Sequence, residues 1–178
     1  MKMHIATLTA ADASAYRTLM LEAYEQAPDA FTTTAEERRV EPESWWVRRI
    51  GSAEGLATSF GAWRDDHLVG TVALEYSSKP KTCHAALVLG MYLKPSARGT
   101  GVGLALMKAA VAAAASRPEI RSLNLTLTEG NASALRLYRS VGFVAWGVQP
   151  EAIRTDAGFR GKVHMSLALP WPRAAALP

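Results

Sequence analysis

The sequence predicts an α+β domain built on a mixed, mostly antiparallel twisted sheet that is flanked by about four helices. Strand-like segments outnumber helical ones, and several follow one another without an intervening helix, which is typical of antiparallel hairpins. Later in the chain, strands alternate with helices, which indicates a parallel crossover. The 178 residues show no internal repeat, long linker or composition shift. We therefore expect one domain over residues 1–170 and a flexible tail over 171–178.

The N-terminal part of the chain begins with an alternating segment and continues with a helical one. Met3 and Ile5 alternate with His4 and Ala6, as in a strand. Alanine and leucine then recur at four-residue spacing, which places them on one helix face. The predicted elements are a strand over 2–8, a helix from Thr9 or Asp12 to about Gln26, a polar loop with a helical turn over 29–41, and a helix from Pro42 that buries Trp46 and Ile50.

The remaining elements follow from alternation, glycine and proline. Leu123, Leu125 and Leu127 alternate with polar residues, as in a strand with one buried face. Pro118 and Gly142 each end a helical segment. The predicted elements are strands over 57–64, 68–76 and 83–93, a helix over 101–116, a strand over 121–128, a helix over 131–141, and closing strands over 143–148 and 162–169.

Composition narrows the class of protein. Cys83 is the only cysteine, so no intramolecular disulfide can form, and we expect a reduced, cytoplasmic protein with no membrane segment. The formal net charge is +4, but the basic residues are dispersed and no aromatic run alternates with them. We therefore expect no nucleic-acid partner and no metal; a phosphate-rich ligand accounts for the basic balance equally well.

A glycine-rich loop lies between a predicted strand and a predicted helix. Glycines allow the backbone to approach a ligand closely, and the first N–H groups of a helix have no internal partner, so the loop suits a pyrophosphate. The Walker A and dinucleotide-binding spacings are both absent. A glycine turn without a ligand stays open on this motif alone. The loop consists of Arg98, Gly99, Thr100, Gly101, Val102 and Gly103.

A second motif forms a capped helix. Asn131 is a favourable N-cap residue and Gly142 a favourable residue after the C-terminus. Tyr138 lies seven residues after Asn131, nearly two turns, so both are on one face. Taken alone, Tyr138 fits a core tyrosine better than a catalytic one.

The pattern R-G-x-G-x-G followed by N-x-x-A-x-x-L-Y-x-x-x-G-F resembles the paired signature of GNAT acetyltransferases. The run at 90–93 also resembles the bulged fourth strand of that family. The order of elements fits over nearly the whole chain, and the resemblance implies a single GNAT-like domain whose sheet splits between its fourth and fifth strands. The matching residues are Arg98, Gly101, Gly103, Asn131, Ala134, Leu137, Tyr138, Gly142 and Phe143.

The resemblance also implies roles for particular residues. The pantetheine arm of acetyl-CoA would pair with the backbone of Met91, Tyr92 and Leu93, and Asn131 would contact it from the other side. The pyrophosphate would bind the loop from Arg98 to Gly103. Tyr138 would donate a proton to the departing thiolate, and a backbone N–H at the bulge would hold the developing oxyanion. The implied reaction is direct attack of a primary amine on acetyl-CoA.

Two matters stay open at this point. The segment 85–93 carries no carboxylate, so the general base is Glu75, His84 or a chain of water molecules. The acceptor is expected to be a small-molecule amine, with a protein N-terminus or lysine as the alternative. A non-catalytic acyl-CoA-binding sensor is a further alternative, and a homodimer and acyl groups other than acetyl are left open.

Overall fold

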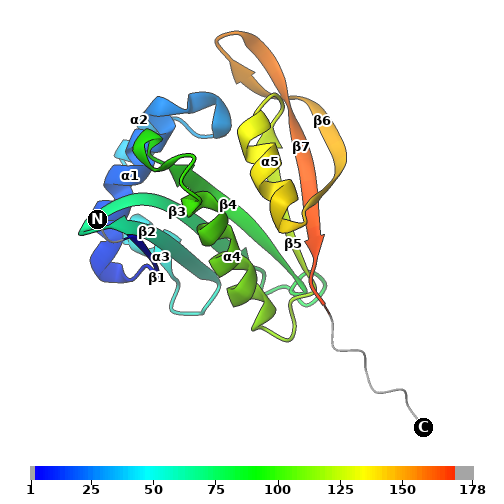
Figure 1. Cartoon of the computed structure of the whole chain (residues 1–178), viewed down its shortest axis with the longest axis horizontal. Coiled ribbons are helices and arrows are strands. Elements are labelled where there is room, and N and C mark those ends of the chain that lie inside the picture. Colours follow the sequence, from blue (N-terminus) through cyan, green and yellow to red (C-terminus); the bar gives the residue numbers. More distant parts are fainter. Residues whose placement is uncertain (1–2, 171–178) are drawn as a thin grey trace.

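The computed structural model describes residues 3–170 of the chain. They form a seven-stranded sheet with the strand order β1-β2-β3-β4-β5-β7-β6 (Figure 1). The expected α+β class is therefore confirmed, while the tail expected at 171–178 lies outside the described residues. The strands are β1 Met3–Thr7, β2 Ala57–Arg64, β3 His67–Tyr76, β4 Ala85–Leu93, β5 Ser122–Thr128, β6 Val144–Thr155 and β7 Gly158–Ala168. The α-helices are α1 Ala13–Gln26, α2 Ala35–Arg39, α3 Glu43–Ile50, α4 Val102–Ala115 and α5 Ala132–Val141, and the short 3-10 helices are η1 Ala10–Asp12, η2 Pro28–Ala30 and η3 Pro95–Ala97.

The sheet is antiparallel everywhere except at the junction of β4 and β5. These two strands run parallel and pair through three residues each, Ala85–Leu87 with Ser122–Asn124. Beyond that point they separate, and Figure 1 shows them diverging in the shape of a V. The predicted split between the fourth and fifth strands is confirmed.

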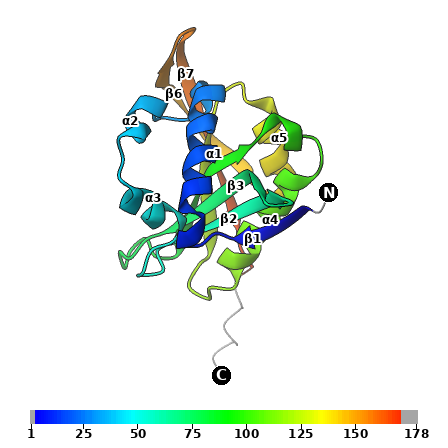
Figure 2. The same ribbon diagram turned by 90° about the vertical axis from the view of Figure 1, so that its left-hand side faces the viewer.

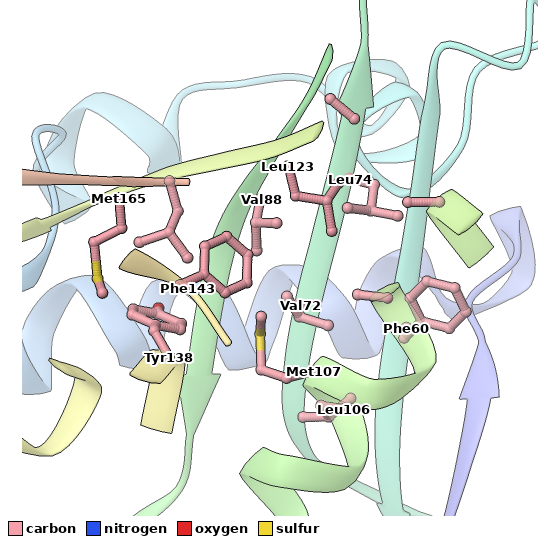
Figure 3. Packing of buried hydrophobic residues seen from close by; sticks show 14 of the residues in the cluster. Phe60, Val72, Leu74, Val88, Leu106, Met107, Leu123, Tyr138, Phe143 and Met165 are labelled. Carbon is pink, nitrogen blue, oxygen red and sulfur yellow. The ribbon is translucent and has the colours of Figure 1, made fainter. Parts of the chain in front are cut away.

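Helices cover the two faces of the sheet unequally. In Figure 2, α1 lies in front of β2 and β3, while α4 and α5 lie to the right, on the other side of the sheet. The core between the sheet and the helices α4 and α5 includes Val72, Leu106, Leu123 and Tyr138 (Figure 3). A second core under α1 and α3 contains Trp46, which is 1% exposed, as its helical spacing predicted.

The closing hairpin is longer than the sequence predicted. The strands were expected over 143–148 and 162–169, whereas β6 continues to Thr155 and β7 begins at Gly158. Pro150 and the positive φ of Glu151 lie within a register shift between Gln149 and Ile153. β6 is an edge strand, where proline and bulges are tolerated, and it is mostly exposed, so no apolar alternation marks it.

Candidate active site

β4 is bulged in the middle of its length. Thr71 of β3 is opposite Tyr92, but Ala73 is opposite Leu89, so β4 contains one more residue than β3 over this stretch. Gly90 has a φ of 63°, in the left-handed region that favours glycine. The bulge expected at 90–93 is therefore present, and it turns backbone groups out of the regular ladder.

The other edge of β4 opens onto a cleft. In the described chain β5 pairs with β4 only as far as Leu87, so the β4 edge beyond that residue has no neighbouring strand. A cavity of about 230 Å³ fills the space between the diverging strands. It is lined by Ala30 of η2, by Phe31 and Thr32 after it, by residues 87–91 of β4, by residues 126–128 of β5, by Asn131, Ala134, Leu137 and Tyr138 of α5 and its cap, and by Lys162 of β7.

The glycine-rich loop adjoins this cleft at the start of α4. Gly99 and Gly101 have φ angles of 72° and 82°, and a Cβ atom at either would meet nothing within 4 Å. The Thr100 hydroxyl donates to the carbonyl of Ala97 at 2.7 Å, which holds the turn. The first hydrogen bond onto this turn from α4 is donated by Ala105 to Gly101, so the amides at the start of α4 remain free for an anion.

Gly103 joins the loop to the cleft. A Cβ atom here would lie 3.2 Å from Leu93, 3.3 Å from Leu137 and 3.5 Å from Met91. Glycine therefore permits α4 to approach β4 and α5 closely. Because Met91 and Leu137 also line the cleft, the start of α4 lies next to it.

Two predicted binding residues have side chains with structural partners. Arg98 donates through Nε to the carbonyl of Leu93 at 3.1 Å, and its guanidinium carbon lies 5.8 Å from the ring centre of Tyr92. The Tyr92 hydroxyl donates to Glu22 at 3.2 Å, and the ring is buried under α1, where burial raises its pKa. Only the backbone of Tyr92 can serve a ligand in the cleft.

α5 brings Asn131 and Tyr138 to the cleft. The Asn131 Oδ1 atom accepts a hydrogen bond from the N–H of Ala134 at 3.1 Å, so this side chain caps the helix, and its amide NH₂ is left to donate. The Tyr138 ring lies 6.1 Å from that of Phe143 and is 7% exposed (Figure 3). Burial raises the pKa of Tyr138 to about 12. Its hydroxyl has no hydrogen-bond partner within residues 3–170.

The two side chains considered as bases lie away from the bulge. Glu75 is opposite Leu87, roughly 10 Å along β4 from Gly90, and its carboxylate is 3.5 Å from Arg49. His84 precedes β4 at the closed end of the V, roughly 20 Å along the extended chain from Gly90. Neither residue lines the cleft between β4 and β5.

Lys162 is a residue of this site that sequence reasoning missed. It is 7% exposed, and its Nζ donates to the Thr128 hydroxyl at 3.1 Å. Burial lowers the pKa of Lys162. The sequence around Lys162 has the alternation of an ordinary half-buried strand. Only the pairing of β7 with β5 places this side chain at the cleft.

A wider groove lies between the α1–α2 region and the closing hairpin. Its volume is about 640 Å³, and its walls come from Tyr24 to Glu36 and from Ala152 to Asp156. The charged side chains that line it are Glu25, Asp29, Glu36, Asp156 and Arg154, and Glu25 and Glu36 also pair with Arg39. Phe31 and Thr32 line both the groove and the cleft, so the two lie next to each other.

Comparison with known proteins agrees with this geometry. The model of the acetyltransferase (GNAT) family matches residues 17–143. The chain therefore belongs to the GNAT family of acetyltransferases and is an acyltransferase.

Within residues 3–170 no helix has the length and apolar character needed to cross a membrane, and no three His, Cys, Asp or Glu side chains group as metal ligands.

Three solved structures illustrate the likeness in fold. A GNAT acetyltransferase from Streptococcus pneumoniae is 19% identical with a TM-score of 0.76, covering 95% of this chain and 100% of its own. The ribosomal-protein-S18-alanine N-acetyltransferase of Escherichia coli is 18% identical with a TM-score of 0.74, covering 99% of each chain. The yncA protein of Salmonella typhimurium, solved with acetyl-CoA, is 18% identical with a TM-score of 0.78, covering 100% of this chain and 98% of its own. At these identities they show the fold alone.

Proposed function

We propose that this protein transfers the acetyl group of acetyl-CoA to a primary amine of a small molecule by direct attack. The observation that carries the proposal is the joining of three features at one cleft. These are an unpaired edge of β4 with a bulge, an open turn of glycines at the start of α4, and the hydroxyl of Tyr138, which has no hydrogen-bond partner among residues 3–170.

The cleft fits acetyl-CoA by the chemistry of its walls. The free backbone of Met91 to Leu93 can pair with the amides of a pantetheine arm, as an added strand would. The loop from Arg98 to Gly103 presents amides, a helix N-terminus and one guanidinium to a pyrophosphate. When bound, acetyl-CoA supplies an activated acyl group.

Tyr138 would supply a proton to the departing thiolate. With a pKa of about 12 the hydroxyl stays protonated over any ordinary assay range, so the proton is always available. The hydroxyl also has no partner in the described chain that competes for it. Backbone N–H groups at the Gly90–Met91 bulge would hold the negative charge that develops on the carbonyl oxygen.

The acceptor would approach through the wide groove on the α1 side. Its mostly acidic lining favours a cationic amine. A volume of about 640 Å³ also admits a peptide chain, so an N-terminal or lysine amine of a protein is the second candidate.

A thiol-release assay tests the proposal. Wild-type protein and acetyl-CoA are incubated with a panel of alkyl amines, amino acids and short peptides with a free N-terminus. Saturable release of CoA with at least one amine, and the acetylated amine by mass spectrometry, is the expected result. Binding of acetyl-CoA without turnover on any amine would instead favour an acyl-CoA sensor.

A further inference from the structure

Lys162 occupies a distinctive position in the cleft. Of the residues that line it, Tyr138 and Lys162 alone carry ionisable side chains. Lys162 is directly opposite Thr128 in the β5–β7 pairing, and η2 packs beyond Thr128. The lysine amine therefore lies beside η2, whose Asp29 also lines the wide groove.

The hydrogen bonds around Lys162 leave its lone pair free. The Thr128 hydroxyl donates its hydrogen to the carbonyl of Asp29 at 2.6 Å, so its oxygen can only accept from Lys162 Nζ. A neutral amine has two N–H donors and one lone pair. One donor is used by Thr128, which fixes the amine, and the lone pair has no partner within residues 3–170.

No charged neighbour holds Lys162 in its ammonium form. The charged and titratable groups on the surrounding elements are Asp29 of η2, Glu129 after β5, Arg136, Tyr138 and Arg139 of α5, Glu151 and Arg154 of β6, and Arg160 and His164 of β7. Among the described residues no carboxylate lies within 4 Å of Nζ, and the His164 ring lies 5.1 Å from that of Trp146. Burial alone lowers the pKa of Lys162, which increases its neutral fraction near pH 7.

We propose that the neutral amine of Lys162 removes a proton from the ammonium group of the acceptor before that amine attacks. This inference rests on the proposed function. In the step, the acceptor N–H bond breaks, a new N–H bond forms on Nζ, and the positive charge moves from the acceptor to Lys162. Water in the open groove then carries the proton away.

The step meets a need of the reaction. An alkyl amine has a pKa near that of a free lysine, about 10.4, so only about one molecule in 2,500 is neutral at pH 7. The cleft has no carboxylate or histidine in its lining to do this work. A desolvated lysine is a suitable base because its pKa can approach the working pH.

Three variants separate this role from others. Lys162→Met keeps an unbranched apolar stem and removes the amine, and Lys162→Arg keeps a positive charge that cannot be released. Lys81→Met, at an exposed turn outside the cleft, is the matched control. Each is assayed with the best alkyl amine of the panel and with hydroxylamine, which is largely neutral at pH 7, after subtraction of the uncatalysed reaction.

We expect both Lys162 variants to lose about 10²-fold in kcat with the alkyl amine and no more than a few-fold with hydroxylamine. Acetyl-CoA affinity and the activity of Lys81→Met should be unchanged. An electrostatic role would spare Lys162→Arg, and a packing role would lower both acceptors equally. Either result overturns the inference.

The dependence of the wild-type kcat/KM on pH tests the role of Lys162 without any variant, and so it does not depend on whether a variant folds. With the alkyl amine, kcat/KM should level off below the pKa of the free amine, where Lys162 has titrated. A tenfold rise per pH unit up to the pKa of the free amine would contradict the proposal. If the wild type releases no thiol with any acceptor, the proposed function itself fails; if it turns over and Lys162→Met keeps its rate, only the role of Lys162 is wrong.

Discussion

The two halves of the sheet are built differently. β1 to β4 are covered on both faces, by α4 on one side and by α1 and α3 on the other, and β3 is buried along nearly its whole length. β5, β7 and β6 are covered mainly by α5 on one face, and Trp146 on β6 remains 65% exposed. The first half is a two-sided scaffold, whereas the second leaves one face available.

The chemistry proposed above would take place at the boundary between these halves. The scaffold contributes backbone, at the bulge of β4 and the start of α4, and these groups depend on packing to stay in place. The other half would contribute side chains, namely Tyr138 from the face covered by α5 and Lys162 from the opposite face, where it is buried beside η2. Variants in the two halves should therefore affect turnover and cofactor binding separately.

The largest effect is expected for Tyr138→Phe. Phenylalanine preserves the packing against Phe143 and removes only the proton donor, so turnover should fall by about 10²- to 10⁴-fold. Steady-state kinetics gives the rate, and calorimetry should find acetyl-CoA affinity unchanged. Undiminished turnover would exclude Tyr138 as the general acid.

The next largest effect is expected at Gly101, and it tests whether the start of α4 binds the cofactor. Gly101→Val places a β-branched residue at a φ of 82° and a methyl-bearing Cβ in the space where an anion would lie, so acetyl-CoA affinity should fall at least about tenfold. Circular dichroism should show the fold retained. Gly147→Ala, where φ is not positive and a Cβ also meets nothing within 4 Å, should bind normally.

A smaller effect is expected on stability, and it tests whether the buried Lys162 destabilises the folded protein. The pKa of Lys162 is lowered in the folded state, so folding is penalised below that pKa and the penalty fades as pH rises toward the unfolded value of 10.5. Lys162→Met should therefore raise the melting temperature by about 2–4 °C near pH 6 and by less near pH 9. Scanning calorimetry at both pH values measures this, and a lowered melting temperature at pH 6 would contradict it.

The smallest effects are expected at Glu75 and His84. Both lie outside the cleft, so Glu75→Gln and His84→Ala should each reduce turnover by no more than a few-fold. The pH–rate profiles of the two variants should match that of the wild type. Loss of nearly all turnover in Glu75→Gln would make Glu75 the base and leave Lys162 without that role.

Local motifs explain what the sequence could predict. The glycine loop, the cap at Asn131 and the position of Tyr138 depend on residues close together in the chain, so spacing alone indicated them. The base proposed here depends on contacts between distant segments. Lys162 and Thr128 are 34 residues apart, and Thr128 and Asp29 are 99 apart, so no local pattern could bring them together.

The closing hairpin was also hidden from local reasoning. Pro150 and the exposed face of β6 removed the alternation that marks a strand, and the register shift is set by pairing with β7. The same exposed hairpin forms one wall of the wide groove, so the wall through which we propose that the acceptor enters could not be predicted from the sequence.

The most direct test of the central claim is a calorimetric titration of acetyl-CoA into the wild-type protein at pH 7. If the cleft between β4 and β5 binds the acyl donor, heat should be released or absorbed with one site per chain, and excess acetyl-CoA should raise the melting temperature. Absence of binding to both acetyl-CoA and free CoA, in a protein that circular dichroism shows to be folded, would contradict the claim.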